Sequence, residues 1–243
     1  MCAAKSPCQT CFLRKKDIFN PFTAHELDFM QAFWAGEDTF ERGDVLFSEG
    51  DALDFFYTVR HGQGARYRHL ANGDRQLVNF IFPGDTIGLQ GVLSGEASST
   101  AIAADKMVLC KFKKSRLPEL FQESPKRAYS LVWIAAVEEH FLCETITTLG
   151  QRNATERMAW AFAKIFMRLK AVGLGRDDTV AFPFRQRDMA DALGLSLVHT
   201  NKTLARLRPY VQWEGGQLRV RDLDQLAEIS MIDYEAVPER PLL

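Results

Sequence analysis

Residues 184–207 read FRQRDMADALGLSLVHTNKTLARL and carry the strongest structural signal in the chain. Apolar residues recur at helical spacing on both sides of Gly194, a residue type that tolerates the positive φ of a tight turn. Ser196 stands where the N-cap of a second helix is expected, because its hydroxyl can accept a hydrogen bond from the first helical turn. This stretch therefore predicts a helix-turn-helix.

The second helix of this unit is predicted to have a buried and an exposed face. Helical spacing places four residues on the inner face: Thr200, Thr203, Leu204 and Leu207. The same spacing turns four others outward: Leu197, Val198, Asn201 and Lys202. Residues 210–220, YVQWEGGQLRV, predict a two-stranded hairpin around Gly215 and Gly216, which makes the module winged.

The charge of this region suits a nucleic-acid partner. The whole chain has a formal net charge of only −1, but residues 152–221 contain 13 Lys and Arg against 6 Asp and Glu. A local basic excess is what binding to phosphates requires. The alternative is an αα-hairpin that binds no DNA, and it would need the turn, the cap, the wing and the charge to coincide. DNA binding is therefore the favoured interpretation.

Residues 39–117 have a different sequence pattern, which is typical of an antiparallel β-roll or jelly roll. Short apolar and β-branched runs alternate with glycine-containing turns at the spacing expected of such sheets. Asn72-Gly73 is the clearest of these turns, because both residue types tolerate the positive φ of a tight hairpin. A helix over residues 25–33, with Thr23 as its N-cap, is expected to precede the roll.

Residues 118–150 predict a long helix with an apolar repeat. Such a repeat favours pairing with a second helix, so a dimer interface is predicted. The residues assigned to this interface are Ala128, Leu131, Ala135, Leu142 and Leu149. A second apolar face, with Trp133, Val137 and Phe141, would allow the helix to pack on its own roll as well.

The chain is thus expected to be an α+β protein in four parts. These are a cysteine-bearing segment (1–24), a β-roll (25–117), a dimerisation helix (118–150) and a winged helix-turn-helix domain (151–243). With 47% hydrophobic and 25% charged residues, the composition is that of a globular protein. No apolar run is long enough for a membrane span and no secretory signal is present, so a cytoplasmic location is predicted.

The order of β-roll, long helix and winged helix-turn-helix resembles the Crp/Fnr superfamily of bacterial transcription regulators. The motifs that carry the resemblance are Pro83–Gly88 in the roll and Gln186–Leu207. It implies a homodimer on a near-palindromic DNA site, and RNA polymerase as a partner if the protein is an activator. The DNA-binding residues expected on this basis are Gln186, Ser196, Leu197, Val198, Asn201, Lys202 and Arg206.

Base recognition should differ from that of many relatives. Those relatives have Arg-Glu where this chain has Leu197-Val198, so its operator is expected to differ. Lys202 can donate to guanine, Asn201 can pair with adenine, and Val198 offers only an apolar contact to a thymine methyl group.

The roll lacks two residues that cyclic-nucleotide-binding members of the superfamily use. A Glu of that branch corresponds to Leu89, and an Arg that holds the phosphate corresponds to Ser99. A cyclic phosphate would lose its charged partner, so binding of cyclic AMP in that mode is not expected.

The cysteines suggest a different signal. Cys8 and Cys11 match the first two ligands of the [4Fe–4S] cluster in the oxygen-sensing branch, and Cys110 matches the distant one. Asp17 occupies the remaining ligand position, and Cys2 is an alternative fourth ligand. The resemblance thus implies a redox sensor with an iron–sulfur cluster.

Other interpretations remain open from sequence alone. Cys8 and Cys11 could be a thiol switch or half of a zinc site, and the roll could bind a small ligand. A jelly-roll metalloenzyme and a purely structural DNA-bridging dimer are alternatives of other classes. Cys143 is expected to be a small buried hydrophobic residue.

Overall fold

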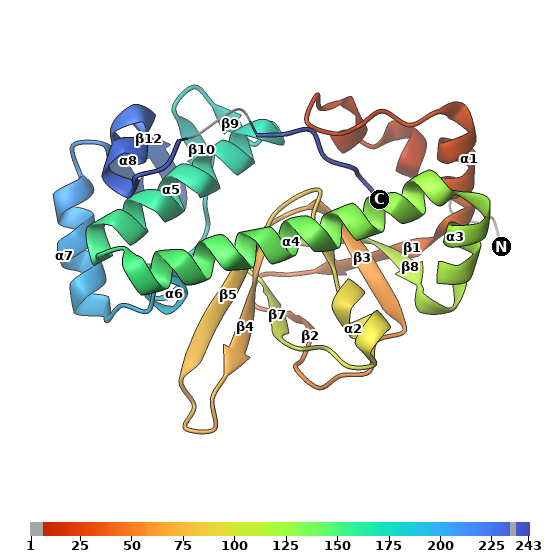
Figure 1. Ribbon diagram of the computed structural model, residues 1–243, viewed down its shortest axis with the longest axis horizontal. Coiled ribbons are helices and arrows are strands. Elements are labelled where there is room, and N and C mark those ends of the chain that lie inside the picture. Colours follow the sequence, from red (N-terminus) through yellow and green to blue (C-terminus); the bar gives the residue numbers. More distant parts are fainter. Residues whose placement is uncertain (1–6, 234–236) are drawn as a thin grey trace. The chain divides into compact units, whose positions relative to one another are not determined.

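The computed structural model describes residues 7–233 and 237–243 of the chain (Figure 1). Its contacts divide the chain into two compact units, which are described separately below. Unit 1 comprises Met1–His69, Asn79–Val137 and Glu239–Leu243, and unit 2 comprises Leu70–Val78 and Glu138–Pro238. Among the described residues, no helix combines the length and apolar character needed to cross a bilayer.

Two four-stranded sheets form the β-roll, as the spacing of the turns predicted. One sheet has the order β1-β8-β3-β6, and the other has the order β2-β7-β4-β5. The strands are β1 (Trp34–Phe40), β2 (Val45–Phe47), β3 (Phe55–His61), β4 (Gly64–His69), β5 (Arg75–Ile81), β6 (Thr86–Ile87), β7 (Thr100–Ala103) and β8 (Met107–Lys113). Gly73 has φ +89° in the turn between β4 and β5, which confirms the predicted hairpin.

Short helices surround the roll in unit 1. Their bounds are η1 (Pro7–Thr10), η2 (Leu13–Lys15), α1 (Ala24–Phe33), α2 (Leu89–Ser94), η3 (Lys114–Arg116) and α3 (Leu117–Glu123). The predicted N-cap of α1 is confirmed, because the Thr23 hydroxyl accepts a hydrogen bond from Glu26 N at 3.2 Å. The Glu26 carboxylate accepts in turn from Thr23 N at 2.8 Å, completing a capping box.

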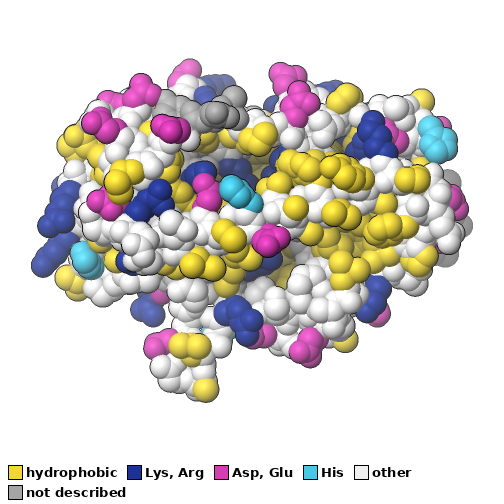
Figure 2. All heavy atoms as spheres, in the orientation of Figure 1, with side chains coloured by type: hydrophobic (Ala, Val, Ile, Leu, Met, Phe, Trp, Pro, Cys, Tyr) yellow, Lys and Arg dark blue, Asp and Glu magenta, His cyan; other side chains and the backbone are white. Residues whose placement is uncertain are grey.

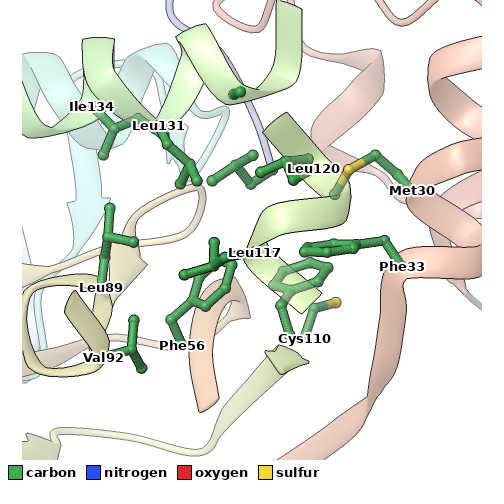
Figure 3. Packing of buried hydrophobic residues seen from close by; sticks show 13 residues of the cluster. Met30, Phe33, Phe56, Leu89, Val92, Cys110, Leu117, Leu120, Leu131 and Ile134 are labelled. Atoms are coloured by element: carbon green, nitrogen blue, oxygen red, sulfur yellow. The ribbon is translucent and has the colours of Figure 1, made fainter. Parts of the chain in front are cut away.

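A long helix, α4 (Pro125–Gln151), follows α3 after a break at Ser124. Its first turns pack on the roll, since Ala128, Leu131 and Ile134 belong to the same buried cluster as Leu89 and Phe56. Figure 3 shows the side chains of Leu131 and Ile134 directed towards this cluster. The remaining buried members are Met30, Phe33, Val92, Cys110, Phe112, Leu117, Leu120 and Leu243.

This packing corrects the interface predicted along α4. Ala128 and Leu131 are buried within their own chain, so they are not available to a second copy. Ala135 is exposed, whereas Leu142 and Leu149 are half-buried. The prediction that Cys143 is buried is also wrong, because this residue is exposed.

The last described residues of the chain pack in unit 1 and are called the C-terminal strap (Glu239–Leu243). Arg240 N donates to Ile18 O at 2.8 Å, and Asn20 N donates to Arg240 O at 3.0 Å. Leu242 and Leu243 are buried. Nothing in the sequence pattern had indicated this attachment.

Unit 2 combines helices with a sheet of order β11-β12-β10-β9. Its further elements are α5 (Ala154–Ala171), β9 (Gly175–Arg176), β10 (Thr179–Ala181), α6 (Gln186–Leu193), α7 (Leu197–Leu207), β11 (Val211–Glu214), β12 (Gln217–Val220) and α8 (Leu223–Ser230). The predicted winged hairpin is confirmed by the antiparallel pairing of β11 with β12. Residues 70–78 join this unit through Arg75, whose guanidinium contacts Asp188 at 3.1 Å and Asp191 at 2.6 Å.

Candidate DNA-binding helix and cysteine cavity

The helix-turn-helix consists of α6 and α7 with a tight turn at Gly194. Gly194 adopts φ +62° as the C-cap of α6, as its position in the sequence predicted. The Ser196 hydroxyl accepts a hydrogen bond from His199 N at 3.2 Å, so Ser196 is the N-cap of α7. Arg157 donates to Leu193 O at 3.1 Å and thereby satisfies a carbonyl at the end of α6.

Helix α7 has the two faces that the sequence predicted. Of the four residues predicted on the inner face, Thr200, Thr203 and Leu207 are buried and Leu204 is half-buried. Both threonine hydroxyls donate to the backbone one turn earlier, at 3.0 and 2.9 Å. The exposed residues include those expected to contact DNA: Ser196, Leu197, Val198, Asn201, Lys202 and Arg206. Gln186 is exposed at the start of α6. Because the buried face of α7 packs within its own chain, the exposed face is available to contact DNA.

Part of the basic excess of this region is structural. Arg152 donates to Ser230 O at 2.7 Å, and Arg219 pairs with Asp178 at 2.6 Å. Lys164 pairs with Glu144 at 2.8 Å. The number of cations that can face phosphate is therefore smaller than the sequence count suggested.

The cysteines predicted as ligands meet at a small cavity in unit 1. Cys8, Cys11 and Cys110 all line this cavity, whose volume is about 30 Å³. Cys8 lies in η1 and Cys11 directly after it, whereas Cys110 lies on β8. Leu242 and Leu243 of the C-terminal strap line the same cavity.

Cys110 sits in the middle of a row of polar side chains. The strand register pairs it with Glu37 on β1 and with Thr58 on β3. Its thiol donates to Glu37 Oε1 at 3.7 Å. Burial raises the pKa of the Cys110 thiol, and the nearby Glu37 carboxylate, Cys8 and Cys11 raise it further. Without a metal, Cys110 is therefore a neutral thiol at pH 7.

Of the remaining proposed ligands, Asp17 is the one that the described residues include, and it is not at the cavity. Asp17 is exposed and is not among the residues that line it. Cys2 lies outside the described residues. Within residues 7–233 and 237–243, no group of three or more His, Cys, Asp or Glu side chains is arranged to hold a metal ion.

The donor chemistry of the cavity fits a cluster better than a single ion. Cysteine thiolates are the usual ligands of iron–sulfur clusters, and this cavity has three cysteines. In a [4Fe–4S] centre each protein sulfur binds a different iron, so the ligands need not converge on one point as they do around zinc. The sharing of one cavity by Cys8, Cys11 and Cys110 meets that looser requirement.

A second feature connects the cysteine segment with α4. Phe22 lies between two guanidinium groups, with Arg14 5.2 Å and Arg127 4.2 Å from its ring centre. Arg14 also donates to Cys8 O at 2.8 Å. Arg127 is buried in α4 and pairs with Glu26 at 2.9 Å. Burial alone would raise the pKa of Glu26, but hydrogen bonds from Thr23 and Arg127 outweigh it and lower the pKa.

Comparison with known proteins identifies the family to which this architecture belongs. A model of the cyclic nucleotide-binding domain matches residues 37–124, and a model of the Crp-like helix-turn-helix domain matches residues 156–229. The nitrogen fixation regulation protein FixK of Bradyrhizobium diazoefficiens is 30% identical over 200 residues, which cover 82% of this chain and 83% of FixK. The chain belongs to the Crp/Fnr family of transcription regulators.

Two further relatives agree with this assignment. The anaerobic regulatory protein of Haemophilus influenzae is 26% identical over 227 residues, which cover 92% of this chain and 87% of that protein. The solved structure of FixK2 from Bradyrhizobium japonicum matches this Crp/Fnr regulator with a TM-score of 0.73 and 25% identity, covering 82% of this chain and 99% of that one. Because these relatives are regulators, the protein is a DNA-binding transcription regulator and not an enzyme.

Proposed function

We propose that this Crp/Fnr regulator binds a near-palindromic DNA site as a homodimer and senses oxygen or redox state through Cys8, Cys11 and Cys110. The observation that carries the proposal is that these thiols, from segments about 100 residues apart, line one cavity. The name of the anaerobic regulatory protein of Haemophilus influenzae supports a signal of this kind. The ligands would hold a [4Fe–4S] cluster, which supplies a redox-active group that oxygen can attack.

The contacts of unit 1 offer a route from the cysteines to the dimer helix. Ligation of Cys8 and Cys11 together with Cys110 would tie the N-terminal segment to β8. Arg14 holds that segment against Phe22, and Phe22 contacts Arg127 on the first turn of α4. Release of the N-terminal segment would therefore disturb the contact between Phe22 and the buried guanidinium of Arg127. Arg127 belongs to α4, the helix through which the two copies would pair.

The homodimer would form along an exposed apolar stripe of α4. Tyr129, Val132, Ala136, Cys143 and Ile146 are exposed. Together with the exposed Glu139, which lies between Ala136 and Cys143, they fall on the alternating three- and four-residue spacing of a coiled-coil seam. Tyr129 and Val132 are 69% and 57% exposed. Figure 2 shows hydrophobic side chains gathered over the N-terminal half of α4. This stripe replaces the one that contains Ala128 and Leu131.

Charge insertion tests the stripe. Val132→Glu should dissociate the dimer, because two carboxylates would be buried without partners in the seam. Gln122→Glu, which adds the same charge at an exposed position of α3, should leave the dimer intact. Sedimentation showing Val132→Glu as dimeric as the parent would contradict the proposed seam.

Cys143 provides a second test of the register. In a parallel dimer, Cys143 of one copy would face Cys143 of the other. A mild oxidant should therefore form a disulfide between the two copies, and Cys143→Ser should abolish this covalent dimer. Dimers that resist this cross-linking would place the seam elsewhere.

Anaerobic purification tests the sensing group. The protein should be straw-brown and contain about four irons per chain, as a [4Fe–4S] centre requires. Cys110→Ser should remove the colour, whereas Cys143→Ser, which changes an exposed thiol outside the cavity, should keep it. Colourless protein with stoichiometric zinc or no metal would contradict the cluster.

The fourth ligand can be assigned with the same assay. Asp17→Cys should lengthen the lifetime of the cluster in air if Asp17 is the weak ligand. An unchanged lifetime, together with loss of iron in Cys2→Ser, would assign the position to Cys2.

A further inference from the structure

Thr58 has a buried hydroxyl for which the structure shows no hydrogen-bond partner. The residue is 3% exposed, and its Oγ1 makes no hydrogen bond with any of the described residues. Leaving a buried hydroxyl unsatisfied destabilises a fold, and native proteins rarely do so without another use for the group. Valine would fill the same space on a strand without this cost, so the hydroxyl itself needs an explanation.

The position of Thr58 indicates which groups its hydroxyl could contact. The register of β3 and β8 places Thr58 directly opposite Cys110, and opposed side chains share one face with Cβ atoms about 4.5–5.5 Å apart. Thr58 also lines the cavity that contains Cys8 and Cys11. Thr58 is therefore the cross-strand neighbour of Cys110 and shares the lining of the cysteine cavity with it.

Two further donors at this cavity are in the same condition. The Nε atoms of Arg14 and Arg60 are buried and have no hydrogen-bond partner in the part of the chain that the structure describes, and both residues line the cavity. Their Nη1 atoms donate to the Cys8 carbonyl and the Glu37 carboxylate respectively. The cavity thus brings together three unused N–H or O–H donors and three thiols. Thiolates and the inorganic sulfides of a cluster are acceptors for such donors.

We infer that Thr58 donates a hydrogen bond to a sulfur atom of the group held by Cys8, Cys11 and Cys110, assisted by the Nε–H groups of Arg14 and Arg60. The inference rests on the proposed function, and it makes Thr58 a positioning residue that tunes the sensor. Hydrogen bonds to sulfur stabilise the more negatively charged state of a cluster, so they raise its reduction potential. They also hold the ligands in place and slow loss of the metal.

A matched control is available on the neighbouring strand. Thr86 on β6 pairs with Thr58 in the sheet register, and its buried hydroxyl also has no hydrogen-bond partner within residues 7–233 and 237–243. Thr86 does not line the cysteine cavity. A hydroxyl with a role only in the packing of the sheet should therefore behave alike at the two positions.

The test compares Thr58→Val with Thr86→Val in anaerobically purified protein that carries its iron. Thr58→Val should shift the reduction potential to more negative values and make loss of the visible absorption in air about 10-fold faster. Thr86→Val should match the parent in both, and Thr58→Ser should restore them because it keeps the hydroxyl. Iron content and circular dichroism confirm that each variant is loaded and folded.

The outcomes separate the two proposals. Parent protein without iron would overturn the proposed cluster and this assignment with it. Iron-bearing parent protein with Thr58→Val unchanged in potential and lifetime would overturn the role of Thr58 alone. If Thr58→Val failed to load, Thr58→Ser loading normally would support the assignment, and failure of both would contradict it.

Discussion

Helix α7 and the cysteine cavity differ in the hydrogen bonding of their buried hydroxyl groups. In α7 the buried hydroxyls of Thr200 and Thr203 donate to the helix backbone, and the face expected to bind DNA is exposed. At the cavity, Thr58 Oγ1 is buried and has no hydrogen-bond partner among the residues described. The buried threonine hydroxyls of α7 are thus satisfied within one chain, whereas the Thr58 hydroxyl is not satisfied by the residues that the structure describes. This difference agrees with the proposal that the cavity takes up a bound group, whereas α7 meets its partner through its exposed face.

The largest expected effect concerns the route from the cavity to α4. Arg127→Ala should lower the free energy of unfolding by about 3–5 kcal/mol, because it leaves the buried Glu26 carboxylate without its main partner. Lys126→Ala is the control, since this exposed lysine contacts the same carboxylate at 3.6 Å and its loss should cost less than about 1 kcal/mol. Urea unfolding measures both, and equal effects would contradict a central role for Arg127.

A smaller effect is expected where α7 meets DNA. Lys202→Ala should weaken binding to the specific site by about 1–3 kcal/mol and relax preference at one position per half-site. Arg208→Ala, at the exposed C-cap of α7, is a control for a loss of positive charge. Titrations on specific and random DNA separate the cases, and a uniform loss on all sequences would make Lys202 a phosphate contact.

The cap of α7 should contribute less again. Ser196→Ala removes the acceptor of the His199 N–H and should destabilise the protein by about 1 kcal/mol. Ser196→Asp keeps an acceptor and should retain most of the stability. Thermal unfolding of the two variants makes the comparison, and equal melting temperatures would show that the cap does not matter here.

No effect is expected from cyclic AMP. Leu89 is buried in the core beside α4, and Ser99 is buried as well, where cyclic-nucleotide-binding relatives have charged residues. Addition of cyclic AMP should leave DNA affinity unchanged, and calorimetry should detect no micromolar binding. Heat of binding at that concentration would mean that the roll holds the nucleotide through other contacts.

The sequence predicted the winged helix-turn-helix in detail because its determinants are local. Gly194, Ser196 and the helical spacing of Thr200, Thr203 and Leu207 act within about fifteen residues, and the structure agrees with each. The apolar repeat predicted for residues 118–150 was less decisive. Two apolar stripes lie side by side on that helix, and helical periodicity cannot say which of them packs on the roll.

What the sequence determined by itself was the order of the elements, the turn and caps of the DNA-binding unit, and the cysteines that form the cavity. Only the tertiary structure decided that Ala128 and Leu131 pack in the core, that Cys143 is exposed, and that the C-terminal strap lines the cavity. It also decided that Thr58 lies opposite Cys110, 52 positions along the chain. The physical reason is that turns and caps depend on neighbours in sequence, whereas strand register and the choice of a buried helix face depend on packing between distant segments.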